Sequence, residues 1–271
     1  MNLTDKKTVI ELLQAHGLFT KKRFGQNFLI NAGILSNIVS AADIKPTDHV
    51  IEIGPGLGVL TEELVKKANK VTSIELDNHL VPILKERFSN QKNFELIHMD
   101  ALKFTPPKTP YKIVANIPYN ITSPLLNHFL QSKNKPTSMT ILVQKEVADK
   151  ITHPLHAKHP KHSILSLQVA LFADAKLIKR VPAGNFFPTP KVESAILQIT
   201  PHKNLIPDAQ ALQILALAKL AFTHKRKKLS HTFKNLPPEI DPNLRPEDLS
   251  VKDWNKINVK VSSYSCQKKP L

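Results

Sequence analysis

Cysteine is almost absent from this chain of 271 residues: Cys266 is its single example, so no internal disulfide can form. This scarcity is typical of a reducing compartment, and we expect a cytoplasmic protein. Long apolar runs are also missing. No segment approaches the length of a membrane-spanning helix, and the helical pattern at the amino terminus lacks the apolar core of a signal peptide. We therefore expect no membrane partner.

Acidic residues are scarce as well. Asp and Glu total 22 against 38 Lys and Arg, which gives a formal net charge of +16. Such an imbalance concerns partners rather than fold, and it favours nucleic acid. A basic enzyme with an ordinary small substrate is the alternative that charge alone leaves open. The length allows a full α/β core together with a smaller second domain.

Short apolar runs alternate with helical patterns through the first half of the chain. Five runs are expected strands: residues 50–53, 71–75, 94–97, 111–115 and 139–143. Strands that alternate with helices at this pitch predict a parallel, doubly wound sheet. Two later runs, residues 164–172 and 194–200, are expected to add antiparallel strands. Together they predict a seven-stranded, mostly parallel, Rossmann-like α/β domain.

The pattern changes after Pro201. Residues 209–222 are strongly helical, and prolines then separate short expected helices, one of which contains Trp254. We expect a boundary near residues 201–207, with the α/β domain at 1–203 and a small all-helical domain at 204–271. Residues 1–30 form an amino-terminal segment of the first domain.

A glycine-rich turn follows the first expected strand. Gly54, Gly56 and Gly58 stand at the carboxyl edge of the sheet, where open α/β sheets bind ligands. Without Cβ atoms, this backbone can approach a ligand closely. The spacing G-x-G-x-G, with Pro55 inside it, differs from the G-x-G-x-x-G of dinucleotide folds. It favours an adenosyl-methionine moiety, which carries no phosphate, over a pyrophosphate, which needs an open helix N-terminus.

Carboxylates end the next two expected strands. Glu75, 21 residues after Gly54, can accept hydrogen bonds from both ribose hydroxyls, and we expect its partners to belong to the ligand. Asp100 can accept from an adenine amino group. The sequence thus predicts S-adenosylmethionine (SAM) as cofactor. Nicotinamide enzymes share this type of sheet, but no hydride-handling site stands beside the glycines.

Four histidines spaced by three, at positions 153, 156, 159 and 162, suggest a zinc site. Pro154 and Pro160 are expected to break any helix that would align them, and no cysteine joins the group. We interpret the segment as a basic loop and expect no metal.

Residues 116–119, Asn-Ile-Pro-Tyr, end the fourth expected strand beside this pocket. An adenine N6 amine is a poor nucleophile because its lone pair is delocalised into the ring. Hydrogen bonds to the Asn116 side chain and the Ile117 carbonyl favour pyramidalisation, and Tyr119 can stack on the base. The pattern predicts methyl transfer to adenine N6. Methylation at pyrimidine C5 needs a nearby cysteine nucleophile, and Cys266 lies far away in the tail.

A second aromatic element precedes residues 194–200. The proline-rich run Phe-Phe-Pro-Thr-Pro begins at Phe186, and a phenylalanine here can face Tyr119 across a flipped base. A loop that merely covers the core is the alternative.

The chain resembles the rRNA adenine N6,N6-dimethyltransferase family, and in particular its bacterial small-subunit branch. The resemblance spans nearly the whole chain and is strongest at residues 22–29, 52–58, 116–119, 144–148 and 186–194. It implies a class I methyltransferase that uses SAM to dimethylate two adjacent adenines in the 3′-terminal hairpin of 16S rRNA, within a 30S subunit or its precursor. We expect it to act as a monomer.

The resemblance also assigns roles. Cofactor contacts fall on Asn27, Leu29, Gly54, Glu75, Asp100 and Asn116, and base-contacting catalytic roles on Asn116, Tyr119 and Phe186. The chain departs from the family at residues 161–163, Lys-His-Ser, where a Tyr-Gly-Arg-like step is usual. This departure concerns contacts to RNA rather than the chemistry.

Two basic stretches predict how RNA is held. Residues 150–191 carry seven Lys or Arg and one acid, and residues 223–234 carry five and none. We interpret them as a phosphate-binding track that recognises RNA by shape and backbone. The alternatives are a 23S rRNA adenine methyltransferase, a protein-glutamine methyltransferase, and a ribosome-assembly factor with dispensable catalysis.

Overall fold

The computed structural model describes residues 1–18, 26–156, 161–202 and 206–267. The chain divides into two compact units. The sheet unit contains Met1–Ala148 and Lys176–Pro201, and the helical unit contains Asp149–Ala175 and His202–Leu271. The chain passes from the sheet unit to the helical unit after Pro201, within the expected boundary region of residues 201–207. The helical unit also takes up Asp149–Ala175, which the sequence analysis assigned to the first domain.

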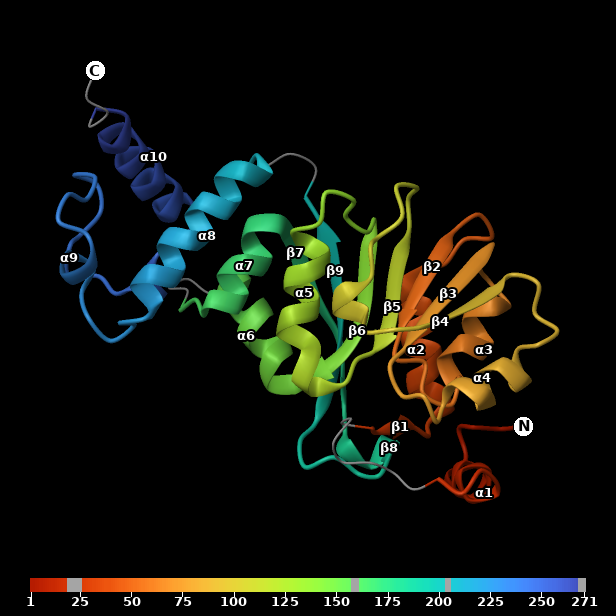
Figure 1. The fold of residues 1–271 in the computed structure, drawn as a ribbon. Coiled ribbons are helices and arrows are strands. Elements are labelled where there is room, and N and C mark those ends of the chain that lie inside the picture. Colours follow the sequence, from red (N-terminus) through yellow and green to blue (C-terminus); the bar gives the residue numbers. More distant parts are fainter. Residues whose placement is uncertain (19–25, 157–160, 203–205, 268–271) are drawn as a thin grey trace. The chain divides into compact units, whose positions relative to one another are not determined.

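A seven-stranded sheet forms the sheet unit, in the order β4-β3-β2-β5-β6-β9-β7 (Figure 1). Its strands are β2 (His49–Ile53), β3 (Lys70–Glu75), β4 (Phe94–His98), β5 (Lys112–Asn116), β6 (Ser138–Gln144), β7 (Ala173–Val181) and β9 (Ser194–Pro201). Strands β2 to β6 pair in parallel, and β9 pairs antiparallel with β6. The mostly parallel sheet is therefore confirmed. From β2 the chain adds β3 and β4 on one side, and it then adds β5 and β6 on the other side. Sheets of this type bind ligands at the point between β2 and β5, where the order changes direction.

Helices α2 (Ala32–Ala42), α3 (Val59–Val65) and α4 (Val81–Arg87) cover one face of this sheet. They bury an apolar stripe against strand residues such as Val50, Val71 and Val114. Helix α5 (Thr122–Leu130) joins β5 to β6, and the 3-10 turns η2 (Ala101–Lys103) and η3 (Tyr119–Ile121) follow β4 and β5. Both turns therefore lie at the carboxyl edge of the sheet.

The amino-terminal segment crosses that edge. Helix α1 (Lys6–Ala15) packs through Val9, Leu12 and Leu13 in an apolar cluster with Phe28 and Leu57. Strand β1 (Phe28–Leu29) then pairs antiparallel with β8 (Phe186–Phe187), which follows the turn η4 (Ala183–Asn185). Segments more than 150 residues apart thus meet beside the strand ends.

One expected strand is wrong: residues 164–172 form helix α7 (Ile164–Phe172). A short, mostly apolar run fits a buried helix as well as a strand. The start signal was Ser163, whose side chain accepts a hydrogen bond from the Ser166 backbone as a helix cap. The seventh strand is instead the next segment, β7. Its exposed lysines belong to the basic stretch at residues 150–191, and no strand was expected there.

A second correction concerns helix α6 (Lys145–His156), which continues through Pro154. The proline lies in the last turn, where its missing N–H removes a single helical hydrogen bond. His159 and Pro160 lie outside the described residues.

The helical unit consists of α7, α8 (Asp208–Phe222), α9 (Leu229–Thr232), η5 (Pro246–Asp248), α10 (Val251–Gln267) and the end of α6. Trp254 is fully buried, with its ring 6.4 Å from the rings of both Phe222 and Phe233. The helix that contains it has 17 residues, so it is long rather than short. Across the described residues, no helix combines the length and apolar character needed to cross a bilayer.

Candidate active site

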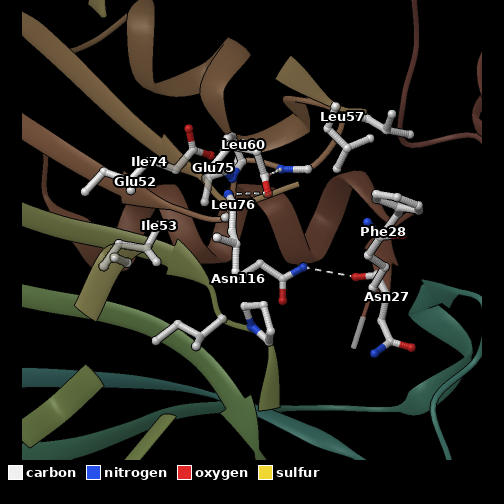
Figure 2. Close-up of a pocket in the computed structure, with 18 of the residues that line it drawn as sticks. Asn27, Phe28, Glu52, Ile53, Leu57, Leu60, Ile74, Glu75, Leu76 and Asn116 are labelled. Atoms are coloured by element: carbon white, nitrogen blue, oxygen red, sulfur yellow. Dashed lines mark hydrogen bonds between the residues drawn. The ribbon is translucent and has the colours of Figure 1, made fainter. Parts of the chain in front are cut away.

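A pocket opens at the carboxyl ends of β2, β3, β4 and β5, and the amino-terminal segment closes one side of it (Figure 2). Most of the predicted site residues line it: Asn27, Leu29, Gly54, Glu75, Asp100, Asn116 and Tyr119. The structure therefore brings together residues that are up to 92 positions apart, from Asn27 to Tyr119. Phe186 is the exception among the predicted residues.

The glycine turn adopts a backbone that other residues disfavour. Gly54, Gly56 and Gly58 all have positive φ angles, of 65°, 61° and 84°. At Gly58 a Cβ atom would lie 2.6 Å from the Phe88 ring, so this glycine is required by packing. Gly54 faces the pocket, and its N–H donates to Ile74 O at 2.9 Å. The turn thus connects β2 to β3 by a hydrogen bond, and its glycines place no side chain on the surface that lines the pocket.

Glu75 is held by three backbone N–H groups. Its Oε1 accepts from Leu76 and Asp77, both at 2.8 Å, and its Oε2 accepts from Gly56 at 3.2 Å. Burial raises the pKa of Glu75, and these hydrogen bonds oppose the shift. Besides any hydroxyl of a ligand, this carboxylate therefore has protein partners of its own, and through Gly56 it fixes the glycine turn.

Glu52 is a site residue that the sequence analysis missed. It lines the pocket, is 1% exposed, and its Oε2 accepts hydrogen bonds from Thr61 at 2.7 Å and Ser73 at 2.6 Å. Within the described part of the chain, Oε1 has no hydrogen-bond partner. Burial raises the pKa of Glu52 to about 7, against the effect of the two hydroxyls. The available signal was an acid at the end of an otherwise apolar strand.

The charge of the pocket distinguishes between cofactors. Its lining includes three carboxylates, from Glu52, Glu75 and Asp100, and no Lys, Arg or His among the described residues. Such a lining repels a pyrophosphate and attracts a ligand that carries a sulfonium and an ammonium group. With the bare glycine turn and the unpaired Glu52 Oε1, the residues present fit SAM.

Asp100 and Leu76 shape the outer part of the pocket. Asp100 Oδ1 accepts from Leu102 N–H at 2.9 Å, which caps η2 and fixes the carboxylate at the strand end. Leu76 is 52% exposed, which is unusual for a large apolar side chain beside a pocket. It supplies an apolar surface that a bound ring can cover. The sequence analysis missed this residue, which directly follows Glu75.

Asn116 is oriented by the amino-terminal segment. Its Nδ2 donates to the Asn27 carbonyl at 3.2 Å, as the dashed line in Figure 2 shows. A carbonyl can only accept, so this contact identifies the amide nitrogen and leaves Oδ1 as an acceptor directed away from Asn27. This carbonyl directly precedes β1, and the pairing of β1 with β8 fixes its position.

Tyr119 is held at its hydroxyl end. Its Oη lies 2.6 Å from Ser194 Oγ, and Ser194 is fully buried at the start of β9. Burial raises the pKa of Tyr119, and the hydrogen bond from Ser194 opposes the shift. The sequence analysis did not identify Ser194. The signal was a hydroxyl residue at the start of an apolar strand.

Phe186 does not line the pocket. It is 1% exposed, pairs with Leu29 across the β1-β8 ribbon and packs in the main core of the sheet unit. The prediction that it faces Tyr119 across a base is therefore not met in this structure. Its neighbour Phe187 is the partly exposed member of the pair, with the Lys6 ammonium 5.4 Å from its ring centroid.

Sequence comparison places these features in a known context. The family model described as "Ribosomal RNA adenine dimethylase" matches residues 17–260. The chain belongs to the ribosomal RNA adenine dimethylase family. Relatives named ribosomal RNA small subunit methyltransferase A include those of Dehalococcoides mccartyi, at 40% identity over 94% of this chain and 93% of the relative, and Streptococcus mutans, at 36% over 95% and 97%. The SAM-dependent methyltransferase prediction is confirmed.

Two solved structures share the fold. A dimethyladenosine transferase from Plasmodium falciparum superposes with a TM-score of 0.74, at 28% identity over 88% of this chain and 98% of that one. The 23S rRNA methyltransferase ErmE superposes with a TM-score of 0.72, at 26% identity over 87% and 100%. The predicted class I methyltransferase fold is thereby confirmed.

The basic stretches of this dimethylase differ from one another in their surroundings. Lys161 pairs with Glu247 at 3.1 Å and Asp248 at 3.5 Å within the helical unit, so two carboxylates compete with phosphate for this ammonium. Lys176 and Lys179 are exposed on β7, an edge strand, where charge also prevents unwanted strand pairing. The residues of the run 225–228 are all exposed. Lys158 and residues 22–25 of the family motif lie outside the described residues.

Proposed function

We propose that this chain transfers methyl groups from SAM to N6 of two adjacent adenines in the 3′-terminal hairpin of 16S rRNA. The substrate is a 30S subunit or its precursor in the cytoplasm, and the enzyme acts as a monomer. The observation that carries the proposal is the Asn116 amide, whose nitrogen is held by Asn27 so that Oδ1 is presented as an acceptor beside an anionic cofactor pocket. That arrangement suits an amine substrate and a cationic donor.

The cofactor side of the reaction rests on the carboxylates. Glu75 is fixed by three N–H groups, and its Oε2, which accepts only one of them, has acceptor capacity left for a ribose hydroxyl. Asp100 is fixed by its cap on η2 and suits an adenine amino group. Glu52 Oε1 is a buried acceptor that suits an ammonium group. SAM, when bound, supplies a methyl group on a positively charged sulfur.

At the target base, Asn116 Oδ1 and the Ile117 carbonyl accept the two amino protons of adenine. This pair of hydrogen bonds favours a pyramidal nitrogen, whose lone pair can then attack in line. Tyr119 stacks on the base and holds the attack geometry. No strong general base is required, because the amine becomes acidic once it is methylated and water can take the proton. Phe186, packed in the core, is given no role here.

RNA binding is assigned to the exposed run at residues 225–228 of the helical unit and to Lys176 and Lys179 on β7. No acid interrupts residues 223–234, so this stretch can contact successive phosphates. On this proposal residues 1–203 form the catalytic domain and residues 204–271 the rRNA-binding domain. Lys161 is left out because it is already paired with Glu247 and Asp248.

A 23S rRNA adenine is the second candidate substrate, because ErmE shares the fold over 87% of this chain. Identity of 36–40% to relatives named as small-subunit enzymes favours 16S rRNA. The test is transfer of labelled methyl groups to undermethylated 30S and 50S particles, followed by nucleoside analysis and primer extension. N6,N6-dimethyladenosine in the 16S 3′ hairpin supports the proposal. Label in 23S rRNA, in another base or in protein overturns it.

A further inference from the structure

Ser194 is a buried hydroxyl beside the site. It is fully buried and lies opposite Gln144 in the β6-β9 pairing. Its Oγ is 2.6 Å from Tyr119 Oη, which is a short hydrogen bond between two hydroxyl groups. The Tyr119 ring lines the pocket, so this contact holds the end of the ring that points into the protein.

The strand that carries Ser194 is itself anchored next to that residue. The backbone N–H of Lys145 donates to the Glu193 carbonyl at 2.9 Å, and the Lys145 ammonium contacts Glu193 Oε2 at 2.7 Å. These contacts join the end of β6 to the beginning of β9. Ser194 therefore offers a hydroxyl at a fixed position rather than on a loop.

Tyr119, in contrast, has few local restraints. It begins the 3-10 turn η3, immediately after the Asn-Ile-Pro run, and its backbone carbonyl accepts from Thr122 Oγ1 at 3.3 Å. Local contacts of this kind fix the backbone but not the plane of the ring. A stacking side chain contributes to catalysis only if its ring plane is held in the attack geometry.

We propose that Ser194 is a positioning residue that fixes the Tyr119 ring before the target base arrives. It acts through Tyr119 and touches neither the base nor the cofactor. We expect loss of this hydrogen bond to lower kcat rather than to raise KM. The bond holds the Tyr119 ring, which orients the reacting base, and it does not contribute to binding of the particle. This inference rests on the proposed adenine methylation.

The experiment compares Ser194→Ala, Tyr119→Phe and the double variant in methyl transfer to undermethylated 30S particles. Each single variant removes one partner of the same hydrogen bond. We expect each to lower kcat three- to tenfold, with KM for the particle and SAM affinity unchanged. The double variant should be no slower than the slower single variant, because the second change removes nothing further.

Thr140→Val is the matched control. Thr140 is a fully buried hydroxyl residue on β6, and in the part of the chain that is described its Oγ1 has no hydrogen-bond partner. Removing it should leave kcat unchanged. Ser194→Thr, which keeps a hydroxyl at the same place, should restore most of the activity lost in Ser194→Ala.

A kcat of Ser194→Ala equal to that of the wild type overturns the inference, as does a double variant whose losses multiply. If Ser194→Ala fails to fold, Tyr119→Phe still tests the bond, because it leaves the buried strand intact. A Tyr119→Phe enzyme with full kcat then overturns the inference. Failure of the proposed function is distinguishable, because the wild type itself would form no N6,N6-dimethyladenosine.

Discussion

The cofactor half and the base half of the pocket are built in different ways. In the cofactor half, Glu75 is held by three backbone N–H groups, and the glycine turn is fixed by its own main chain. In the base half, each reactive side chain is anchored by a hydrogen bond to a distant segment: Asn116 contacts the Asn27 carbonyl, and Tyr119 contacts Ser194.

This difference has a consequence for mutation. The glycines and carboxylates of the cofactor half come from one stretch, Glu52 to Asp100, and their hydrogen bonds also maintain the turns of the sheet edge. Changing them should affect binding and stability together. Residues of the base half are held by single contacts across the fold, so changing them should affect rate with little effect on stability.

The largest expected effect is at Asn116. Asn116→Ala should lower the rate of methyl transfer at least about 100-fold, or about 2.7 kcal/mol of barrier, because it removes a preorganised acceptor. Binding of the 30S particle should persist, since it is spread over the basic surface. The assay is radiolabelled transfer together with particle binding. Asn120→Ala changes an exposed neighbour in the same turn and should lose far less; equal losses in both variants contradict the assignment.

Much of the cofactor half was predictable from the sequence. Its signals are local: a glycine turn after an apolar run, then Glu75 and Asp100 at the ends of the next two strands. The parallel sheet brings those ends to one edge, so order along the chain translates directly into position. Glu52 was not predicted because its role depends on its burial beside the glycine turn. The spacing of residues along the sequence does not show burial.

The base half was predictable only in part. Asn116 and Tyr119 follow a strand, but their anchors lie 89 and 75 positions away and depend on tertiary packing. The sequence did not reveal that Phe186 packs in the core and pairs with Leu29, because both features depend on long-range contacts. Residues 164–172 were wrongly expected as a strand because a short, mostly apolar run does not distinguish a buried helix from a buried strand.

Glu75→Ala should show the coupling of binding and stability. Loss of charge-assisted contacts to the ribose should weaken SAM binding by about 2–4 kcal/mol. Because three backbone N–H groups also lose their acceptor, the melting temperature should fall as well. Calorimetric titration and a thermal melt measure the two effects. Unchanged SAM affinity contradicts the cofactor assignment, and an unchanged melting temperature contradicts the structural role of Glu75.

Charge reversal at Arg226 and Lys227 should separate RNA binding from both halves of the pocket. Each lost phosphate contact should reduce the slope of log K against log salt concentration by about 0.7–0.9, with SAM affinity unchanged. The measurement is particle binding across a salt series. Reversal at Lys252 and Lys256, exposed on α10, is the matched control. If both pairs of changes give the same slope as the wild type, the run at 225–228 is only a solvated surface.

The smallest expected effect concerns the pH dependence of stability at Glu52. Its pKa is raised to about 7 in the folded protein by burial. An unfolded glutamate has lost its proton above pH ~4.5. Between these values the folded state binds more protons, so this residue's contribution to stability falls as pH rises from about 4.5 to 7. Glu52→Gln should therefore gain stability relative to the wild type as pH rises toward 7.

The measurement is the difference in melting temperature between Glu52→Gln and the wild type, without SAM, from pH 5 to 8. One proton limits the slope to about 1.4 kcal/mol per pH unit, and about 1 kcal/mol corresponds to roughly 2–4 °C for a domain of this size. Glutamine can keep the hydrogen bonds from Thr61 and Ser73, so the fold should survive. Glu95→Gln is the control, because the hydrogen bond from Lys70 lowers the pKa of that carboxyl and it stays ionised throughout this range. A difference that is flat with pH for Glu52→Gln, as it should be for Glu95→Gln, means that the buried carboxyl is ionised in the folded protein throughout this range.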